Sequence, residues 1–421
     1  MPYITEQATV QGAVRIPGSK SHTIRALLLA AAAEGQSIIG NPLYSKDTEA
    51  CIAACRLLGA DIDCWDDSIR VRGIGGLFKA AENIIDVGNS GTTLYLTAPL
   101  ASLADGATVF TGDEQIRSRP ISPLLQSLND LGAEAWSTKG NGSAPVVVKG
   151  RLKGGRTKIE CPTSQYLSGL LLAAPLAEKD TIIDVPLLHE RPYVDMTLNW
   201  LKKAGIHVEN DSYKRFRVPG GQKYKAMDSS VAADFSSATF FMCAPALTGG
   251  SLTLQGLDMN DPQGDKAVLG MLERMGCVVT RAGGEITLNG AGLRGADLDL
   301  NSTPDALPAM AVTACFAKGK TRLGNVPQAR LKETDRIAVT AKELAKLGAK
   351  ITELEDGLEI EYSPLRGGTV SGHKDHRIVM ALAIAGLAAS GPIEIDDVSA
   401  ASITFPTFFE LLDSIKTKGA R

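Results

Sequence analysis

Two cationic residues stand among hydroxyl side chains at the start of an apolar run, an arrangement that suits the binding of anions. Residues 17–25 have the sequence Pro-Gly-Ser-Lys-Ser-His-Thr-Ile-Arg and lead into the apolar run 26–33. Ser and Thr at a helix start satisfy free backbone N–H groups, and the helix dipole makes that end electropositive. Lys20 and Arg25 add two full charges there, so we expect this end to hold phosphate or carboxylate groups.

Polar residues open five further Ala-rich apolar runs. The six starts are marked by Lys20, Ser90, Ser164, Ser236, Asp305 and Asp375, so successive starts are 69 to 74 residues apart. A second marker, the Gly at the end of a charged helix, occurs 71 to 73 residues apart at Gly59, Gly132, Gly205, Gly276, Gly348 and Gly419. Two markers with one period indicate six copies of a supersecondary unit.

The helix starts carry different donors, which favours function over simple capping. Copy two has Asn89, copy three has Thr163 and Gln165, and copy six has His376 and Arg377. Hydroxyls, amides and cations hold phosphate and carboxylate oxygens. Capping explains Ser, Thr and Asp at these positions but does not explain the inserted cations.

Two loop segments are also rich in charge. The segment 112–120 contains Arg117 and Arg119, and two arginines before a helix N-terminus are expected to contact an anion. The alternative interpretation is a solvated loop, with Pro120 as the first residue of the next helix. The segment 330–336 holds three cations and two carboxylates and is expected to open the second helix of copy five. Such a run is also typical of an exposed helix start with local ion pairs.

Each copy is expected to run strand, apolar helix, strand, amphipathic helix, strand. The first helix of a copy is apolar on nearly all sides and should be buried, whereas the second should lie outside. In copy one we expect Ser19 to cap the first helix and Gly35 to end it. Pro99, Pro175 and Pro245 lie inside apolar runs and should shorten or kink those helices.

The length and composition of the chain limit its domain number and the kinds of partner it can have. The 421 residues divide into two sets of three copies with a boundary near 227–233. A net charge of −3 argues against nucleic acid as the main partner. We find no secretory signal, no apolar run of membrane-spanning length, no phosphate loop and no dinucleotide motif, and we expect a cytoplasmic α/β protein. The seven cysteines are expected to be mostly buried thiols, and His373 with His376 is weak evidence for a metal.

Taken together, the motifs resemble those of 5-enolpyruvylshikimate-3-phosphate synthases over essentially the whole chain. The matching segments are residues 17–21 with Arg25, Gly88-Asn89-Ser90-Gly91-Thr92, Arg119-Pro120-Ile121, Ser164-Gln165, Lys332-Glu333-Thr334-Asp335-Arg336, Asp375-His376-Arg377 and Thr404-Phe405-Pro406.

The resemblance implies a fold of two inside-out α/β domains with the active site in the interdomain cleft. Each domain has three βαβαββ repeats around buried helices, six in all. The implied domains are residues 19–230, and residues 1–18 with 231–421, because the N-terminal strand joins the C-terminal half. The family is generally monomeric.

The implied reaction transfers the enolpyruvyl group of phosphoenolpyruvate to the 5-hydroxyl of shikimate 3-phosphate and releases phosphate, on the route to chorismate and the aromatic amino acids. The implied catalytic residues are Lys20, Asp305 and Glu333. Phosphoenolpyruvate would contact Lys20, Asn89, Gly91, Arg119, Gln165, Arg336 and Arg377. Shikimate 3-phosphate would contact Lys20, Ser21, Arg25, Thr163, Ser164, Gln165, Tyr193, Asp305, Gln328 and Lys332. No metal or organic cofactor is implied, and glyphosate inhibition is expected from the family.

Four positions depart from the usual family pattern: Tyr95 in place of Arg, Glu190 in place of Ser, Gln328 in place of Asn, and Ile403 in place of a Lys that contacts phosphoenolpyruvate. The alternatives are a transferase acting on UDP-N-acetylglucosamine, a paralogue with another acceptor alcohol, and a non-catalytic anion-binding repeat protein. The segment 112–120 has no Cys, which disfavours the first alternative. The carboxylates of Asp305 and Glu333 disfavour the last.

Overall fold

The structure, a computed structural model, describes residues 1–417, so the expected helix-terminal marker Gly419 lies outside the described residues. The contacts divide the chain into two compact units. The N-terminal unit is Gly18–Val231, and the C-terminal unit combines Met1–Pro17 with the chain from Ala232 onward. The chain therefore passes from one unit to the other twice, after Pro17 and after Val231.

The N-terminal unit holds three repeats. The first comprises α1 (Lys20–Ala32), β3 (Glu34–Gly40), α2 (Lys46–Leu57), β4 (Asp61–Cys64) and β5 (Ser68–Ile74). The second comprises β6 (Ile85–Asp86), α3 (Gly91–Ala101), β7 (Ala107–Thr111), α4 (Ser122–Asp130), β8 (Glu134–Ser137) and β9 (Val146–Lys149). The third comprises β10 (Gly155–Cys161), α5 (Ser164–Ala173), η1 (Ala174–Leu176), β11 (Thr181–Leu188), α6 (Arg191–Lys203), β12 (Glu209–Asp211) and β13 (Arg215–Val218), and β14 (Ser229–Ser230) follows.

The C-terminal unit begins with β1 (Tyr3–Thr5) and β2 (Thr9–Arg15). Its fourth repeat comprises α7 (Phe235–Thr248), β15 (Ser251–Gln255), η2 (Gly264–Lys266), α8 (Ala267–Arg274), β16 (Val278–Ala282) and β17 (Glu285–Asn289). The fifth comprises β18 (Asp297–Asp299), η3 (Pro304–Ala306), α9 (Leu307–Cys315), β19 (Lys320–Gly324), η4 (Pro327–Leu331), α10 (Arg336–Lys346), β20 (Lys350–Leu354) and β21 (Gly357–Glu361). The sixth comprises β22 (Gly368–Val370), α11 (His376–Gly386), β23 (Ile393–Ile395), η5 (Ser399–Ile403), α12 (Phe408–Ser414) and β24 (Lys416–Thr417).

The sheets repeat one strand order. In the second, third and fifth repeats, the first two strands are parallel and the closing hairpin is antiparallel, as in β6-β7-β9-β8, β10-β11-β13-β12 and β18-β19-β21-β20. The connection between the parallel strands is the buried helix of the repeat, which is the crossover that a parallel pair requires. The observed order within a repeat is therefore βαβαββ, as expected.

The strand that opens the first repeat and the strand that opens the fourth are exchanged between the two units. β2 precedes α1 in the sequence but pairs in parallel with β15, with Gln11 opposite Ser251. β14 precedes α7 but pairs in parallel with β3, with Ser229 opposite Ile39. In the sixth repeat β1 pairs antiparallel with β23, and so it takes the place that a closing hairpin strand has in the other repeats.

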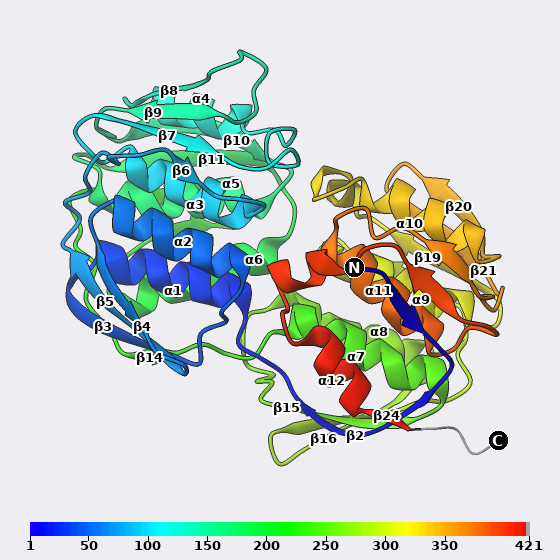
Figure 1. The fold of residues 1–421 in the computed structure, drawn as a ribbon. Helices are drawn as coiled ribbons and strands as arrows, with labels where there is room; N and C mark the ends of the chain where they lie inside the picture. The colour runs from blue at the N-terminus through cyan, green and yellow to red at the C-terminus, as the bar shows by residue number, and fades with distance from the viewer. Residues whose placement is uncertain (418–421) are drawn as a thin grey trace. The chain divides into compact units, whose positions relative to one another are not determined.

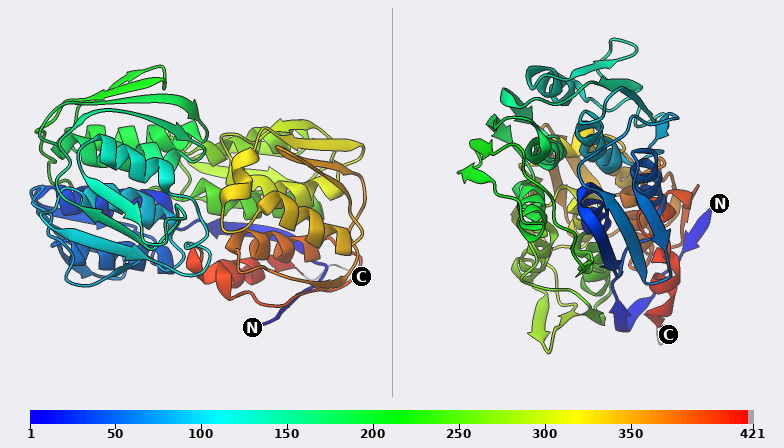
Figure 2. Two further views of the ribbon diagram at one scale, coloured as in Figure 1. Left: turned by 90° about the horizontal axis from the view of Figure 1, so that it is seen from above. Right: turned by 90° about the vertical axis from the view of Figure 1, so that its left-hand side faces the viewer.

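The first helix of each repeat is buried and the sheets lie outside these helices. Every residue of α3, α9 and α11 is buried, because small and aliphatic side chains cover all sides of these helices. Figures 1 and 2 show the strands at the periphery of each unit and the buried first helices within it. The second helices bury one face only; in α10 the buried residues include Ile337 and Leu344. The expected inside-out α/β fold is confirmed.

Glycine ends the second helix of five repeats in a left-handed conformation. Gly59, Gly132, Gly205, Gly276 and Gly348 have φ between 81° and 111° and follow the C-cap residues of α2, α4, α6, α8 and α10. Only glycine adopts this conformation without steric cost, which explains why this marker has a regular period.

Three local expectations were wrong. α1 ends at Ala32, because the chain turns directly into β3, and Gly35 lies inside that strand. Ser19 is the N-cap residue of α1, but its side chain does not cap the helix, and Thr23 donates to the Ser19 carbonyl oxygen instead at 2.9 Å. Pro120 precedes the next helix, which starts at Ser122 with Pro123 at its beginning.

The prolines had mixed effects. α5 ends at Ala173 immediately before the short helix that contains Pro175, as expected for a shortened helix. Pro99 lies in the last turn of α3. Pro245 does not shorten α7, which continues to Thr248.

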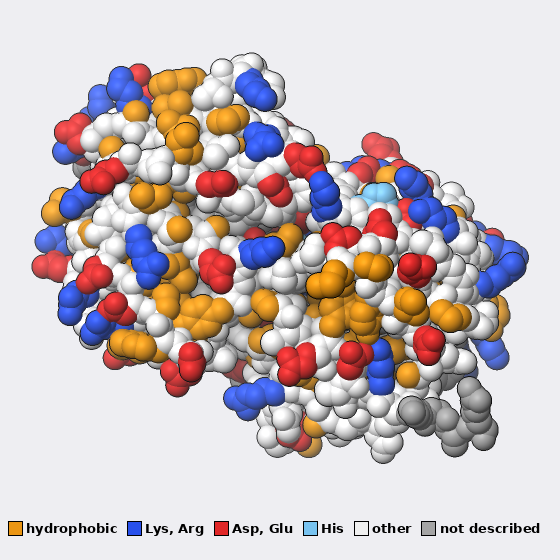
Figure 3. Space-filling model, viewed as in Figure 1, with side chains coloured by type: hydrophobic (Ala, Val, Ile, Leu, Met, Phe, Trp, Pro, Cys, Tyr) orange, Lys and Arg blue, Asp and Glu red, His pale blue; other side chains and the backbone are white. Residues whose placement is uncertain are grey.

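The surface charges are mixed in sign, and most cysteines are buried, as expected from the sequence. On the face drawn in Figure 3, acidic and basic side chains are interspersed. All seven cysteines are free thiols, and each is buried except Cys64. Within residues 1–417, none of the helices has the length and apolarity that crossing a bilayer would take.

Candidate active site

The C-terminal unit gathers ionisable side chains at the N-terminal ends of its buried helices. Asp305 lies in η3, just before α9, while Glu333 precedes α10 and Arg336 is its first residue. Asp375 caps α11 and Arg377 is in its first turn. α9 contacts both α7 and α11, so these helix ends lie together and their dipoles reinforce an electropositive site.

Arg336 is the centre of this cluster. Its side chain is 1% exposed, and its Nη1 donates to Asp305 Oδ1 at 2.8 Å. Nε donates to Asp375 Oδ2 at 2.9 Å, and Nη2 donates to Asp375 Oδ1 and to Glu333. Burial alone would lower the pKa of Arg336, but the charges of Asp375, Glu333 and Asp305 outweigh burial and raise it. Arg336 is therefore a permanent cation held among three carboxylates.

Asp305 is ionised in this setting. Burial would raise the pKa of Asp305, but the charges of Arg377, Lys332 and Arg336 outweigh burial and hold that pKa well below its usual range. Lys332 Nζ lies 3.9 Å from Asp305 Oδ1, and Arg377 Nη2 lies 3.5 Å from Asp305 Oδ2. A carboxylate fixed among cations can accept a proton from a substrate once those cations turn to the substrate.

Arg377 links the sixth repeat to the fourth. Its Nη1 donates to the backbone oxygen of Ser236 at 2.9 Å, and its guanidinium carbon lies 5.7 Å from the centre of the Phe240 ring. Its side chain is 4% exposed, and its Nε has no hydrogen-bond partner among the described residues. A buried cation with a donor left over is suited to an anionic ligand.

A possible metal-ligand group overlaps this cluster. Ligand atoms of Glu333, Asp375 and His376 lie within 4.8 Å of one another. However, Arg336 contacts both carboxylates, so a cationic side chain already neutralises them. Burial lowers the pKa of His376 to about 3, which keeps its imidazole neutral.

Gln328 is bound to the backbone between β18 and η3. It is in η4 and its Nε2 donates to the backbone oxygen of Asn301 at 3.0 Å. The side chain is buried, and its Oε1 has no hydrogen-bond partner among the described residues. The segment 330–336 comprises the end of the 3-10 helix η4 and a link to α10, so only its last residue belongs to the α-helix.

In the N-terminal unit, the starts of α1 and α3 meet at Asp47. Lys20 Nζ donates to Asp47 Oδ2 at 2.9 Å, and the Lys20 side chain is 16% exposed. Thr93 Oγ1 donates to the Asp47 backbone oxygen at 3.2 Å. Lys20 is thus a partly exposed cation whose direction is fixed by a buried carboxylate.

Arg25 is buried one turn further along α1 among uncharged groups. Its Nε donates to Thr197 Oγ1 at 2.8 Å, and its Nη atoms donate to the backbone oxygens of Ser21 at 3.0 Å and Tyr193 at 3.2 Å. Burial lowers the pKa of Arg25 to about 10, so the guanidinium remains charged at neutral pH. Its charge makes the nearby start of α5 favourable for an anion.

Asn89, Gly91 and Arg119 form one contact group at the start of α3. Arg119 Nη2 lies 3.4 Å from Asn89 Oδ1, and the Arg119 side chain is buried. A Cβ on Gly91 would lie 2.6 Å from Arg119 Nη1. Glycine at this position is therefore required for the guanidinium to approach the helix start.

A carboxylate of the chain occupies the start of α5. Glu190 Oε2 accepts hydrogen bonds from Ser164 N at 3.2 Å, from Ser164 Oγ at 2.9 Å and from Thr163 Oγ1 at 3.4 Å. Glu190 is 1% exposed and has φ 57°, an unfavourable conformation for this residue type. Oε1 of the neighbouring Gln165 is buried with no hydrogen-bond partner in the described chain.

Tyr95 and Ile403 replace expected cations with less polar groups. Tyr95 OH donates to the Pro120 backbone oxygen at 3.2 Å, and its ring packs at 82° to that of Tyr166, with 5.2 Å between centroids. Ile403 ends η5 and is partly buried against the core of the C-terminal unit.

Within each unit the structure brings predicted residues together. The C-terminal group contains Asp305, Lys332, Glu333, Arg336 and Arg377; the N-terminal unit forms smaller groups around Lys20, Arg25, Arg119 and Ser164. The sequence missed Asp47 and the ion pairs of Asp375, since an acidic residue at a helix start is equally typical of capping. The contacts of Glu190 were also missed, although its replacement of Ser was a signal.

Comparisons with known proteins agree with this geometry over the length of the chain. The sequence profile of the family described as EPSP synthase (3-phosphoshikimate 1-carboxyvinyltransferase) matches residues 4–412. The chain belongs to the EPSP synthase family. A relative named 3-phosphoshikimate 1-carboxyvinyltransferase from Ruminiclostridium cellulolyticum is 53% identical over 99% of this chain and 98% of its own.

Two further relatives extend this result. A protein of the same name from Acetivibrio thermocellus is 55% identical over 96% of each chain. The solved structure of EPSP synthase from Acinetobacter baumannii superposes with a TM-score of 0.83 at 30% identity, covering 99% of this chain and 98% of that one. The expected family, fold and enzyme class are confirmed, and these relatives do not favour the alternative functions.

Proposed function

We propose that this protein transfers the enolpyruvyl group of phosphoenolpyruvate to the 5-hydroxyl of shikimate 3-phosphate and releases phosphate. The observation that carries the proposal is the ionised Asp305, which is surrounded by Arg336, Arg377 and Lys332. A reaction between two anions needs cations to offset their repulsion and a carboxylate to take up the hydroxyl proton.

Substrate binding changes the basicity of Asp305 in this mechanism. The carboxylate and phosphate groups of phosphoenolpyruvate compete with Asp305 for Arg336 and Arg377, and each contact that Asp305 loses raises its affinity for a proton. Asp305 then accepts the proton of the 5-hydroxyl as the hydroxyl oxygen bonds to the enol carbon, while the electron pair of the broken C=C π bond takes up a proton at the methylene carbon. In the second step the resulting methyl group loses a proton, the C=C bond forms again and the bond from carbon to the phosphate oxygen breaks. Glu333, which contacts Arg336, is placed to transfer the proton at this carbon.

Both units contribute to the proposed reaction. Lys20 contacts both substrates, Asn89, Gly91, Arg119 and Gln165 contact phosphoenolpyruvate, and Ser21, Arg25, Thr163, Ser164, Gln165, Tyr193, Gln328 and Lys332 hold shikimate 3-phosphate. The support is that a cation lies in the first turn of a buried helix in each unit, Lys20 in α1 and Arg377 in α11, where backbone N–H groups favour anions. The two units are the two domains of the proposed enzyme.

The test is phosphate release from phosphoenolpyruvate with shikimate 3-phosphate, compared with UDP-N-acetylglucosamine as acceptor. Turnover is expected with the former only, and turnover with the latter alone would refute the proposal. Lys20→Ala should lower the rate about 10²-fold or more through loss of an electrostatic contact, and Asp305→Asn about 10²–10⁴-fold through loss of the base. Matched controls are Lys46→Ala and Asp297→Asn, which alter exposed residues.

We also propose that the enzyme acts as a cytoplasmic monomer. The support is that one chain supplies every residue the mechanism uses, and that its phosphorylated substrates are products of intracellular metabolism. Light scattering at assay concentration should give the mass of one chain, about 44.3 kDa.

A further inference from the structure

The turn that leads into α11 has an unfavourable backbone conformation. His373 has φ 50° and Lys374 has φ 56°, so two successive residues with side chains are left-handed. They come directly before Asp375, the N-cap of α11. Such conformations persist only where the surrounding structure holds them, and they are concentrated at functional sites.

Glu343, in the third turn of α10, holds this turn. Its carboxylate Oε2 accepts a hydrogen bond from Ser371 N at 2.9 Å, and its Oε1 lies 2.8 Å from His373 Nε2. The side chain is 1% exposed. Burial would raise the pKa of Glu343, but the hydrogen bonds from His373, Lys346 and Ser371 outweigh it and lower the pKa, so the carboxylate is charged.

A second carboxylate and close packing complete the support of the turn. Gly372 N donates to Asp396 Oδ1 at 2.9 Å, so consecutive N–H groups of the turn are bound by two different acidic residues. A Cβ on Gly372 would lie 2.5 Å from Val379 Cγ2, which shows that the turn packs directly against α11.

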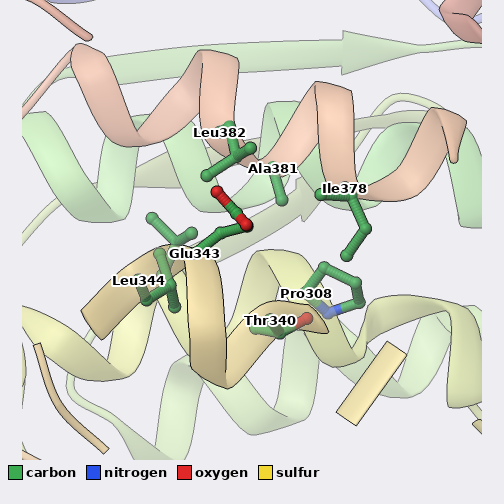
Figure 4. Close-up of a pocket in the computed structure, with 8 residues that line it drawn as sticks. Pro308, Thr340, Glu343, Leu344, Ile378, Ala381 and Leu382 are labelled. Carbon is green, nitrogen blue, oxygen red and sulfur yellow. The ribbon is translucent and has the colours of Figure 1, made fainter. Parts of the chain in front are cut away.

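The surroundings of Glu343 leave its carboxylate little freedom. A small pocket between α9, α10 and α11 borders it and is lined mainly by apolar side chains. Figure 4 shows Glu343 extending from α10 toward Leu382 on α11, with Pro308 of α9 and Ile378 of α11 lining the same pocket. A charged carboxylate gains nothing from these apolar neighbours, so its hydrogen bonds to the turn define its position.

The turn is connected to the anion-binding cluster by short contacts. Asp375 N donates to the Gly372 backbone oxygen at 2.9 Å. The Asp375 side chain accepts from Arg377 N at 2.9 Å and pairs with Arg336. A displacement of the turn therefore moves the cap of α11, and the two guanidinium groups that contact Asp305 move with it.

We propose that Glu343 is a positioning residue for phosphoenolpyruvate: by holding the left-handed turn 371–374, it fixes Asp375 and hence Arg336 and Arg377. This inference rests on the proposed function, because it assumes that Arg336 and Arg377 bind phosphoenolpyruvate. Glu343 itself touches no substrate, so its removal acts on the geometry of the clamp and not on proton transfer.

The test compares Glu343→Ala, Glu343→Gln and Lys346→Ala. In Glu343→Ala the turn loses both contacts, and KM for phosphoenolpyruvate should rise about tenfold or more. KM for shikimate 3-phosphate should remain near the wild-type value. Glu343→Gln keeps an acceptor for Ser371 N and should lie between Glu343→Ala and wild type. Lys346→Ala removes a half-exposed partner of Glu343 and leaves the turn contacts, so its KM values should match wild type.

The outcomes separate positioning from simple destabilisation. A variant that only folded less completely would lose apparent kcat with both KM values unchanged, and that result would overturn the inference. Equal increases in both KM values would also overturn it. If the wild-type protein released no phosphate, the proposed function would fail, and calorimetric binding of phosphoenolpyruvate to wild type and Glu343→Ala would still test the role of Glu343.

Discussion

Replacing Gly91 with Ala is a sharp test of the Arg119 site, because the structure fixes where the new methyl group must go. The added Cβ would lie 2.6 Å from Arg119 Nη1 and 3.4 Å from Tyr95 Cε2. The contact with Tyr95 is acceptable, but the contact with Arg119 is too short. The end of the Arg119 side chain must therefore move, while the backbone of α3 can stay in place.

The size of the effect follows from that displacement. An ordinary contact at about 3.4 Å requires the guanidinium to move by about 0.8 Å. This is enough to break one charge-assisted hydrogen bond to an anion, which contributes about 1.5–3 kcal/mol and corresponds to a rise of about 10- to 150-fold in KM. Folding should change little, because Ala is favoured over Gly in a helix by about 0.5–1 kcal/mol.

The assay is steady-state phosphate release with each substrate varied in turn. KM for phosphoenolpyruvate should rise by this factor, whereas KM for shikimate 3-phosphate and the melting temperature should stay near wild type. Gly270→Ala is the matched control, since Gly270 is in α8 and a Cβ there meets no atom within 4 Å. An unchanged KM for phosphoenolpyruvate in Gly91→Ala would refute the placement of Arg119 in the substrate site.

Three further predictions concern charge. Glu190→Ser should lower KM for shikimate 3-phosphate about fivefold or more, since the carboxylate holds the Ser164 donors that we propose bind the phosphate, and a raised KM would contradict this. His376→Gln should flatten the pH dependence of the free energy of unfolding between pH 6 and 4.5. The folded-state pKa of about 3 lies below the value in the unfolded chain, so the wild-type free energy of unfolding decreases by about 1.4 kcal/mol for each unit by which the pH is lowered. Arg336→Ala should cost about 3–5 kcal/mol in urea unfolding at pH 7 and less at pH 4, where the carboxylates left unpaired around Asp305 can be protonated; an equal loss at both pH values would exclude a charge effect.

The repeat architecture could be predicted because short sequence patterns determine where its helices begin and end. The left-handed Gly that follows the second helix in the first five repeats and the polar residue that opens each apolar helix recur with one period, and both have a local steric or hydrogen-bonding cause. Local signals failed at both ends of α1. The side chain of Ser19 does not cap α1, and α1 passes into β3 before Gly35 can end it.

The sequence indicated which residue types form the candidate site, but it did not indicate which side chains they contact. Lys20 and Arg377 stood out because capping alone does not explain cations at helix starts, whereas Arg336 was assigned to the site through the family resemblance. Their partners are distant in sequence: Arg336 pairs with Asp375, and Glu343 holds a turn that begins at Ser371. No periodic pattern encodes such pairings, so they became visible only in the folded chain.

The exchanged strand β2 has a consequence for synthesis of the protein. The ribosome releases β2 before all of Gly18–Val231, yet its partner β15 follows that entire unit. The nascent chain must therefore carry an unsatisfied strand edge while the intervening unit folds, and such edges promote aggregation. Chains truncated beyond Arg15 would leave this edge of β15 unpaired permanently, so removal of β2 should promote aggregation through the C-terminal unit.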